Sequence, residues 1–251
     1  SFLVLQYAPV GYIYLIPFAW CPIIARVFYD SRTAIFVHLI TVFIVSLAVP
    51  APYLFLFIQA LTGIIAVVSL RDMTQRAQLA QTAAFIFLSY CILYTASTML
   101  MAGSIANVEY KYYFYFAINA VLVICAYGLI FLFERTFGLV SNITLVELTN
   151  VNSNLMLEFA EKAPGTFQHS LQVSNLATEA AKRIGAKVLL VRTGALYHDI
   201  GKMAHPEFFI ENQTGHNPLQ DMPYDEAAKV IIEHVNDGER IARKRRLPEV
   251  I

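Results

Sequence analysis

The chain has 251 residues, of which 57% are hydrophobic and only 14% are charged, and its formal net charge is zero. A soluble domain carries roughly 25% charged residues, so this composition, with a mean hydropathy of +0.56, excludes a purely soluble protein. The three cysteines lie in or beside apolar runs without a C-x-x-C motif, which argues against a disulfide framework or a thiolate metal site.

Apolar residues are concentrated in the first half of the chain, where five segments have the length of about 20 residues that a bilayer-spanning helix needs. They are 2–20, 33–49, 51–70, 79–102 and 113–133. Pro50 and Pro52 leave room for only a tight hairpin between the second and third segments. We therefore expect residues 1–137 to form an all-α, polytopic helical bundle in the lipid bilayer of the cell (inner) membrane.

Three polar residues fall inside these segments: His38, Gln59 and Asn119. Polar residues inside a membrane can mark a ligand path, or they can form hydrogen bonds between helices. The second interpretation is favoured here.

Basic residues indicate the orientation of the bundle, since Lys and Arg gather in short cytoplasmic loops. Only Lys111 lies on one side of the predicted bundle, and five arginines share the other. The arginines are Arg26, Arg32, Arg71, Arg76 and Arg135. This bias places Ser1 outside and the segment after residue 137 in the cytoplasm.

Residues 138–162 are predicted to form a linker of two short helices. Leu145, Leu148, Leu155 and Phe159 follow a helical stripe that asparagines interrupt between 150 and 154. The linker either transmits a signal or simply packs on the domain that follows, and the second interpretation is slightly favoured. The linker has no sustained heptad repeat, so its sequence does not predict a dimeric coiled coil. Whether the protein forms a homodimer is left open.

The remaining segment, 163–251, contains a pair of metal-ligand side chains, His198 and Asp199, at the end of an apolar helix. Histidine supplies an imidazole nitrogen, and aspartate supplies two oxygens that can bridge two ions about 3.5–4 Å apart. His169 precedes the pair and His234 follows it, each on a separate predicted helix. Such a cluster is typical of a metal site for phosphate-ester hydrolysis.

His169 and His234 are both expected to point from their helices towards a core. Thr166 is the expected N-cap and Gly185 the expected C-cap of the first helix. On it, His169 shares an apolar stripe with Val173, Leu176 and Ala180. His234 shares a stripe with Ala227, Val230 and Ile231 before Asp237-Gly238 ends the third helix.

Three segments carry a resemblance to a known family: 163–170 (APGTFQHS), 194–202 (GALYHDIGK) and 206–213 (PEFFIENQ). In this order they resemble the HD-domain metal phosphohydrolases, and more narrowly the seven-transmembrane HD proteins of the PgpH type. The resemblance implies a cyclic-dinucleotide phosphodiesterase that hydrolyses cyclic di-AMP to linear pApA. It also implies a centre of two divalent ions, iron or manganese, with His169, His198, Asp199 and His234 as ligands.

Two catalytic residues are expected, Asp199 and Lys202. The Lys202 ammonium can neutralise charge on the transferring phosphate, although a lysine after a helix end can equally offset the helix dipole. The family's HD domain continues with a His-His pair and a later Asp, which are absent before Ile251. We therefore expect these 251 residues to hold only the N-terminal part of the HD domain, and to be inactive by themselves.

Alternatives remain open for the function. An HD hydrolase of another nucleotide, such as a dNTP or an alarmone, would share the same motif, and so would a membrane receptor that binds a nucleotide without cleaving it. A basic run lies between Arg240 and Arg246, but neither interleaved aromatic residues nor a nucleic-acid module accompany it. No nucleic-acid partner is expected.

Overall fold

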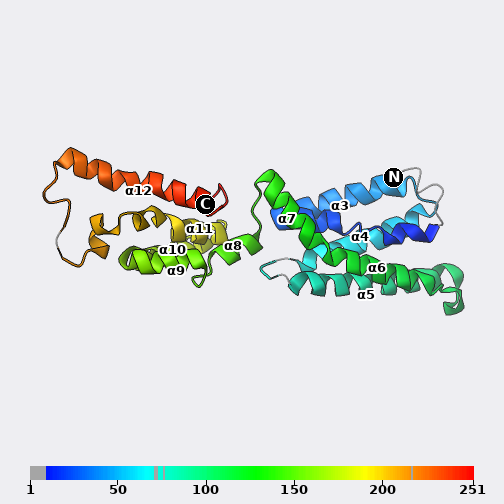
Figure 1. Ribbon diagram of the computed structural model, residues 1–251. Helices are drawn as coiled ribbons and strands as arrows, with labels where there is room; N and C mark the ends of the chain where they lie inside the picture. The colour runs from blue at the N-terminus through cyan, green and yellow to red at the C-terminus, as the bar shows by residue number, and fades with distance from the viewer. Residues whose placement is uncertain (1–9, 71–72, 76, 216) are drawn as a thin grey trace. The chain divides into compact units, whose positions relative to one another are not determined.

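The computed structural model describes residues 10–70, 73–75, 77–215 and 217–251, and the described residues form helices and no strand (Figure 1). By the contacts between its residues, the chain divides into one unit of residues Ser1–Ile143 and a second of residues Thr144–Ile251. The all-α fold is therefore confirmed. The finer division at residues 137 and 162 stays a prediction.

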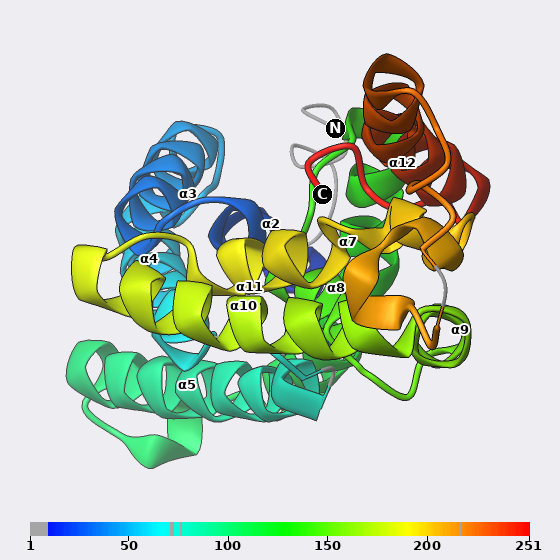
Figure 2. The ribbon, with the colours of Figure 1, turned by 90° about the vertical axis from the view of Figure 1, so that its left-hand side faces the viewer.

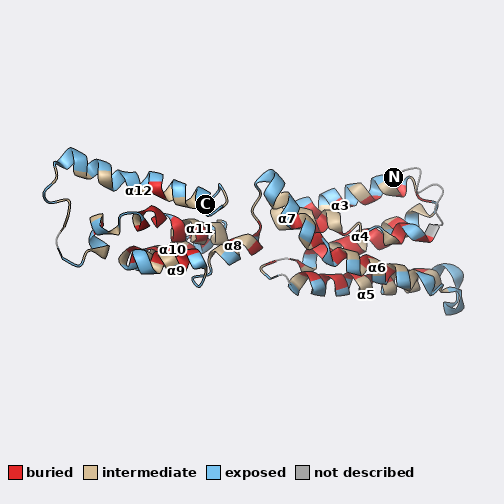
Figure 3. Ribbon diagram, viewed as in Figure 1, coloured by how far each residue is buried: buried red, intermediate tan, exposed pale blue. Residues whose placement is uncertain are grey.

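The first unit is a bundle whose helices follow one another along the chain. They are η1 (Val10–Leu15), α2 (Trp20–Phe28), α3 (Ser31–Ser46), α4 (Pro52–Ser69), α5 (Ala77–Ala102), η2 (Ile105–Asn107), α6 (Lys111–Ile124) and α7 (Ala126–Phe137). Large apolar side chains such as Phe43 and Leu100 are exposed. Exposed positions recur along the helices of this unit (Figure 3). Apolar groups on the outside suit a helix that faces lipid.

Four helical segments of the described residues are long and apolar enough to cross a membrane: Gly11–Phe28, Pro52–Ser69, Ala77–Ala102 and Lys111–Phe137. The segment expected at 33–49 is the apolar helix α3, which has only 16 residues. At 1.5 Å per residue this helix is about 24 Å long, less than the roughly 30 Å of a hydrocarbon core. The first eight residues of the expected segment 2–20, up to residue 9, lie outside the described residues.

Polar residues in the first unit join helices to one another. His38 on α3 donates its ring N–H from Nε2 to the Gln59 carbonyl oxygen on α4 at 2.9 Å. Tyr90 on α5 donates its hydroxyl to Gln59 Oε1 at 2.7 Å. Asn119 on α6 donates to the Tyr14 carbonyl oxygen at 2.9 Å. The favoured interpretation of His38, Gln59 and Asn119 as interhelical hydrogen-bonding residues is confirmed.

The second unit begins within α8 (Asn142–Leu148) and contains the site. It continues with α9 (Asn154–Lys162), α10 (Pro164–Ile184), α11 (Val188–Tyr197), three short turns η3 (Ile200–Met203), η4 (Pro206–Phe208) and η5 (Ile210–Asn212), and α12 (Tyr224–Lys244). The two short helices expected in the linker are therefore present as α8 and α9. Helices α10 and α11 lie side by side in both views of the ribbon (Figures 1 and 2).

The predicted stripe on α10 is wrong. Its buried residues are Thr166, Ser170, Ser174, Thr178 and Ala181. His169 and Ala180 are exposed, and Leu176 is 74% exposed. The buried side chains are small, which allows α10 and α11 to approach closely, and hydropathy alone does not select them.

Two predicted helix ends also differ. Helix α10 begins at Pro164, and Thr166 lies inside its first turn rather than at the N-cap. Gly185 does end this helix in a left-handed conformation, with φ of 69°, as predicted. Helix α12 continues through Asp237-Gly238 to Lys244, because Gly238 packs closely against Gly201 of the preceding turn.

Candidate metal centre

The His198-Asp199 pair lies where α11 ends and the turn η3 begins. Two buried side chains hold α11 on α8: Tyr197 donates its hydroxyl to the Leu148 carbonyl oxygen at 2.9 Å, and Thr193 donates to the Leu145 carbonyl oxygen at 3.4 Å. Burial raises the pKa of Tyr197 to about 12, so its hydroxyl remains a donor at neutral pH. The end of α11 is thus anchored immediately before the pair.

Glycine at position 201 lets α12 reach the same turn. A Cβ added at Gly201 would lie 1.9 Å from the His234 carbonyl oxygen and 2.5 Å from the Gly238 nitrogen. The turn therefore packs directly on the backbone of α12. This close approach brings His234 to the carboxylate of Asp199.

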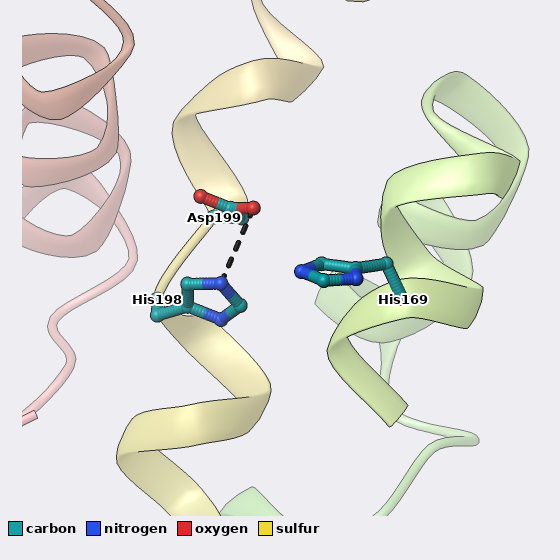
Figure 4. Close-up of side chains that lie close together, drawn as sticks. All are labelled: His169, His198 and Asp199. Carbon is teal, nitrogen blue, oxygen red and sulfur yellow. Dashed lines mark ion pairs between the residues drawn. The ribbon is translucent and has the colours of Figure 1, made fainter. Parts of the chain in front are cut away.

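The four predicted metal ligands, Asp199 among them, come together at the Asp199 carboxylate. One ligand atom from each of His169, His198 and Asp199 lies within 4.8 Å of the other two (Figure 4). The Nε2 atom of His198 is 3.2 Å from Asp199 Oδ2, and the Nε2 atom of His234 is 3.7 Å from Asp199 Oδ1. Each oxygen of the Asp199 carboxylate therefore faces a different histidine.

The histidine rings are oriented as metal ligands are. The Nδ1 atom of His198 lies 2.8 Å from the Ala195 carbonyl oxygen, and Nδ1 of His234 contacts the Ile231 carbonyl oxygen. A carbonyl can only accept, so each Nδ1 carries the proton. In metalloproteins a backbone carbonyl commonly binds the ring N–H of a ligand histidine and leaves the other nitrogen for the ion.

The donor set fits a divalent cation. With bonds of about 2.1 Å, one ion holds donor atoms no more than about 4.2 Å apart, slightly less than the spread seen here. His169 and His198 are exposed, so a small rotation of either ring closes that difference. Imidazole nitrogens with carboxylate oxygens suit zinc, iron or manganese, and the residues therefore fit the centre that the resemblance implies.

The electrostatics of the site keep its carboxylate ionised. Burial acts to raise the pKa of Asp199, but hydrogen bonds from His198 and Lys202 outweigh it and hold this pKa below its ordinary value. The bond to Asp199 raises the pKa of His198. Burial acts to lower the pKa of Lys202, yet its bonds to Asp199 and Glu211 raise it overall. An anionic Asp199 is the form that binds a metal ion.

Lys202 lies between two carboxylates. Its Nζ is 2.8 Å from Asp199 Oδ2 and 3.0 Å from Glu211 Oε1. It also lies 4.9 Å from the centre of the Phe209 ring. No pattern in the sequence marks Glu211 as a site residue, although it lies in the segment 206–213 that carries the family resemblance.

Comparison with known proteins follows the same division of the chain. A family model described as "7TM receptor with intracellular HD hydrolase" matches residues 1–141, which is more than half of the chain. The chain belongs to this family. A second model, described as "HD domain", matches residues 166–251 and covers all four predicted metal ligands. The membership, together with the four membrane-length apolar helices, makes the chain a membrane protein.

Relatives of known name are similar to nearly the whole of this chain. The cyclic-di-AMP phosphodiesterase PgpH of Listeria monocytogenes serotype 1/2a is 34% identical over 95% of this chain, and that of Bacillus subtilis is 29% identical over 98%. The chain spans about a third of the length of these two relatives, 34% and 35% respectively.

Solved structures include the L. monocytogenes PgpH HD domain in complex with cyclic-di-AMP. It is 42% identical to this chain where the two align, which covers 41% of this chain and 48% of that one, with a TM-score of 0.39.

Proposed function

We propose that the protein is a membrane-bound, metal-dependent phosphodiesterase that hydrolyses cyclic di-AMP to linear pApA. The observation that supports it best is the Asp199 carboxylate, whose two oxygens face His198 and His234 separately. Two relatives are named cyclic-di-AMP phosphodiesterases, and the HD domain of one of them has been solved with cyclic-di-AMP bound.

The proposed metal ligands are His169, His198, Asp199 and His234. These residues would hold two divalent ions, iron or manganese; His198 faces Oδ2 of Asp199 and His234 faces Oδ1. A divalent ion held there supplies Lewis acidity, which stabilises the negative charge that develops on phosphate oxygens during hydrolysis. The buried position of Asp199 strengthens its interaction with a cation.

Lys202 is the proposed contact to a substrate phosphate. An ammonium group has three N–H donors, and two of them have carboxylate acceptors, Asp199 and Glu211. The third can donate to a phosphate oxygen without release of the first two. Such a donor stabilises charge on the phosphate where it develops.

The second unit, which contains the metal centre, is proposed to lie in the cytoplasm, where nucleotides are found. Support comes from the arginine bias, in which Arg26, Arg32 and Arg135 are described residues, whereas Arg71 and Arg76 lie outside them. The family description also names the hydrolase intracellular.

The test measures hydrolysis of cyclic di-AMP by the purified intact protein in detergent with manganese. It compares the wild type with the variant Asp199→Asn. The amide keeps the shape of the carboxylate but loses its charge, so turnover should fall by at least about 10³-fold, or about 4 kcal/mol of barrier. Helicity measured by circular dichroism should stay unchanged. Near-normal turnover in this variant would contradict the assignment of Asp199.

The same preparation separates the alternatives. Faster turnover of a dNTP or an alarmone than of cyclic di-AMP would favour a different nucleotide hydrolase. Saturable binding of cyclic di-AMP without any product, at full metal occupancy, would favour a receptor.

A further inference from the structure

A glutamate beside the site links its helices through hydrogen bonds. Glu211, in the turn η5, accepts at one atom, Oε1, from two donors: Thr166 Oγ1 at 2.8 Å and Lys202 Nζ at 3.0 Å. Thr166 lies in the first turn of α10, three residues before His169. Lys202 in turn donates to Asp199 Oδ2 at 2.8 Å. One chain of contacts thus runs from the helix of His169 to the carboxylate of the site.

The backbone of η5 is fixed on α10 by a second set of contacts. Asn212 Oδ1 accepts from the Thr166 backbone N–H at 3.1 Å, and Asn212 Nδ2 donates to Thr166 Oγ1 at 2.8 Å. A Cβ added at Gly165 would lie 1.8 Å from the Glu211 carbonyl oxygen. The missing side chain at Gly165 is therefore what lets η5 lie on the start of α10.

The geometry leaves Lys202 little freedom. Its side chain is 15% exposed, and its ammonium is held between Asp199 and Glu211 over the Phe209 ring. If Glu211 were removed, only Asp199 would remain as a carboxylate partner, and this long side chain would regain rotamers. The contact with Asp199 Oδ2 would then be held less firmly.

We infer that Glu211 is a positioning residue of the metal centre. It holds Lys202 against Asp199 Oδ2 and, through Thr166, ties the helix of His169 to that carboxylate. This role rests on the proposed metal centre and extends it to a residue that contacts neither His169 nor Asp199 directly. Residues that orient metal ligands from outside commonly affect metal affinity or activity by about 10–100-fold.

Three variants of the intact protein in detergent test this role. Glu211→Ala removes the acceptor, and Glu211→Gln keeps an oxygen that can accept from both Thr166 and Lys202. Glu207→Ala is the matched control, because Glu207 lies in the neighbouring turn η4, is half exposed and pairs with His205 at 3.6 Å.

The first measurement needs no metal. Acylation of Lys202 by an amine-reactive reagent, followed by peptide mass spectrometry on the metal-free protein, reports how firmly the ammonium is held. Acylation should be faster in Glu211→Ala than in the wild type. It should stay at the wild-type rate in Glu207→Ala and return close to it in Glu211→Gln.

The second measurement is manganese affinity by titration calorimetry, with steady-state kinetics on cyclic di-AMP. Glu211→Ala should bind manganese about 10–100-fold more weakly. Its activity should fall in kcat rather than in KM, because Glu211 and Lys202 act together on the Asp199 carboxylate. Glu211→Gln should recover most of both losses. The number of ions bound at saturation should not change.

Two outcomes would overturn the inference. Unchanged Lys202 acylation and manganese affinity in Glu211→Ala would show that Glu211 holds nothing in place. Loss of a bound ion in both Glu211 variants would make the residue a ligand instead. A wild type that binds manganese but cleaves no cyclic di-AMP would contradict the proposed function alone, since acylation and manganese binding would still decide the role of Glu211.

Discussion

Substitution of Gly201 by alanine should displace His234 from the candidate metal centre. A Cβ at this position would lie 1.9 Å from the His234 carbonyl oxygen, whereas ordinary contact begins at 3.4 Å, so the two backbones must separate by about 1.5 Å. All three atoms that block the Cβ belong to the backbone of α12, and no side-chain rotation can make room. The displacement must therefore move α12 or the turn that holds Asp199.

The consequence for the site follows from one distance. His234 Nε2 is 3.7 Å from Asp199 Oδ1, and a shift passed on in full would widen this gap to about 5 Å. Donor atoms on a single ion lie no more than about 4.2 Å apart, so His234 could no longer share an ion with that oxygen. Loss of a residue that only orients a metal ligand weakens metal binding by about 10–100-fold. Displacement of His234 itself should weaken manganese binding by no less than that.

Gly194→Ala provides the matched control. Gly194 lies within α11, seven positions before Gly201, and a Cβ there meets no atom within 4 Å. Alanine should therefore leave metal binding unchanged and stabilise the helix by about 0.5–1 kcal/mol. Titration calorimetry with manganese and thermal unfolding in detergent measure both effects. Equal manganese affinity in Gly201→Ala and the wild type would refute the idea that this close packing places His234.

Two further predictions concern the first unit. Gly63→Ala should destabilise the first unit in thermal unfolding by about 1–3 kcal/mol, because the added Cβ would lie 1.9 Å from His38 Nε2. Gly128→Ala should not, because a Cβ there meets no atom within 4 Å. Equal losses of stability in the two variants would contradict the close packing of Gly63 on His38. A reporter fused after Gly138 should behave as cytoplasmic and a tag in 103–111 should be reachable from outside, because basic loops stay in the cytoplasm, and the reverse pattern would overturn the orientation.

Much of the site could be predicted from the sequence because its chemistry is local. His198 and Asp199 are adjacent, and the outer histidines each lie on a strongly helical segment, so a convergence of three helices follows from few assumptions. The structure brings His169 and His234 to the pair, as expected. What could not be predicted is how they arrive there, since that depends on contacts between distant segments.

The face of α10 shows why. Hydropathy places Leu176 inside, yet the buried positions carry hydroxyl groups on Thr166, Ser170 and Ser174. Small side chains let two helices approach, and the hydroxyls at such positions can bond within their own helix, as Thr178 does to the Ser174 carbonyl oxygen at 2.6 Å. A periodicity count scores these residues as polar and assigns them to the wrong face.

The same limit explains the glutamate of the site. Glu211 is an ordinary loop residue in the sequence, and only the approach of η5 to Gly165 brings it to Thr166 and Lys202. Gly201 acts likewise for α12 and His234. Both glycines lie in the segments that carry the family resemblance, within four residues of His169 or Asp199. The ligands provide the chemistry of the centre, and the glycines beside them let the neighbouring segments come close enough for that chemistry to be assembled.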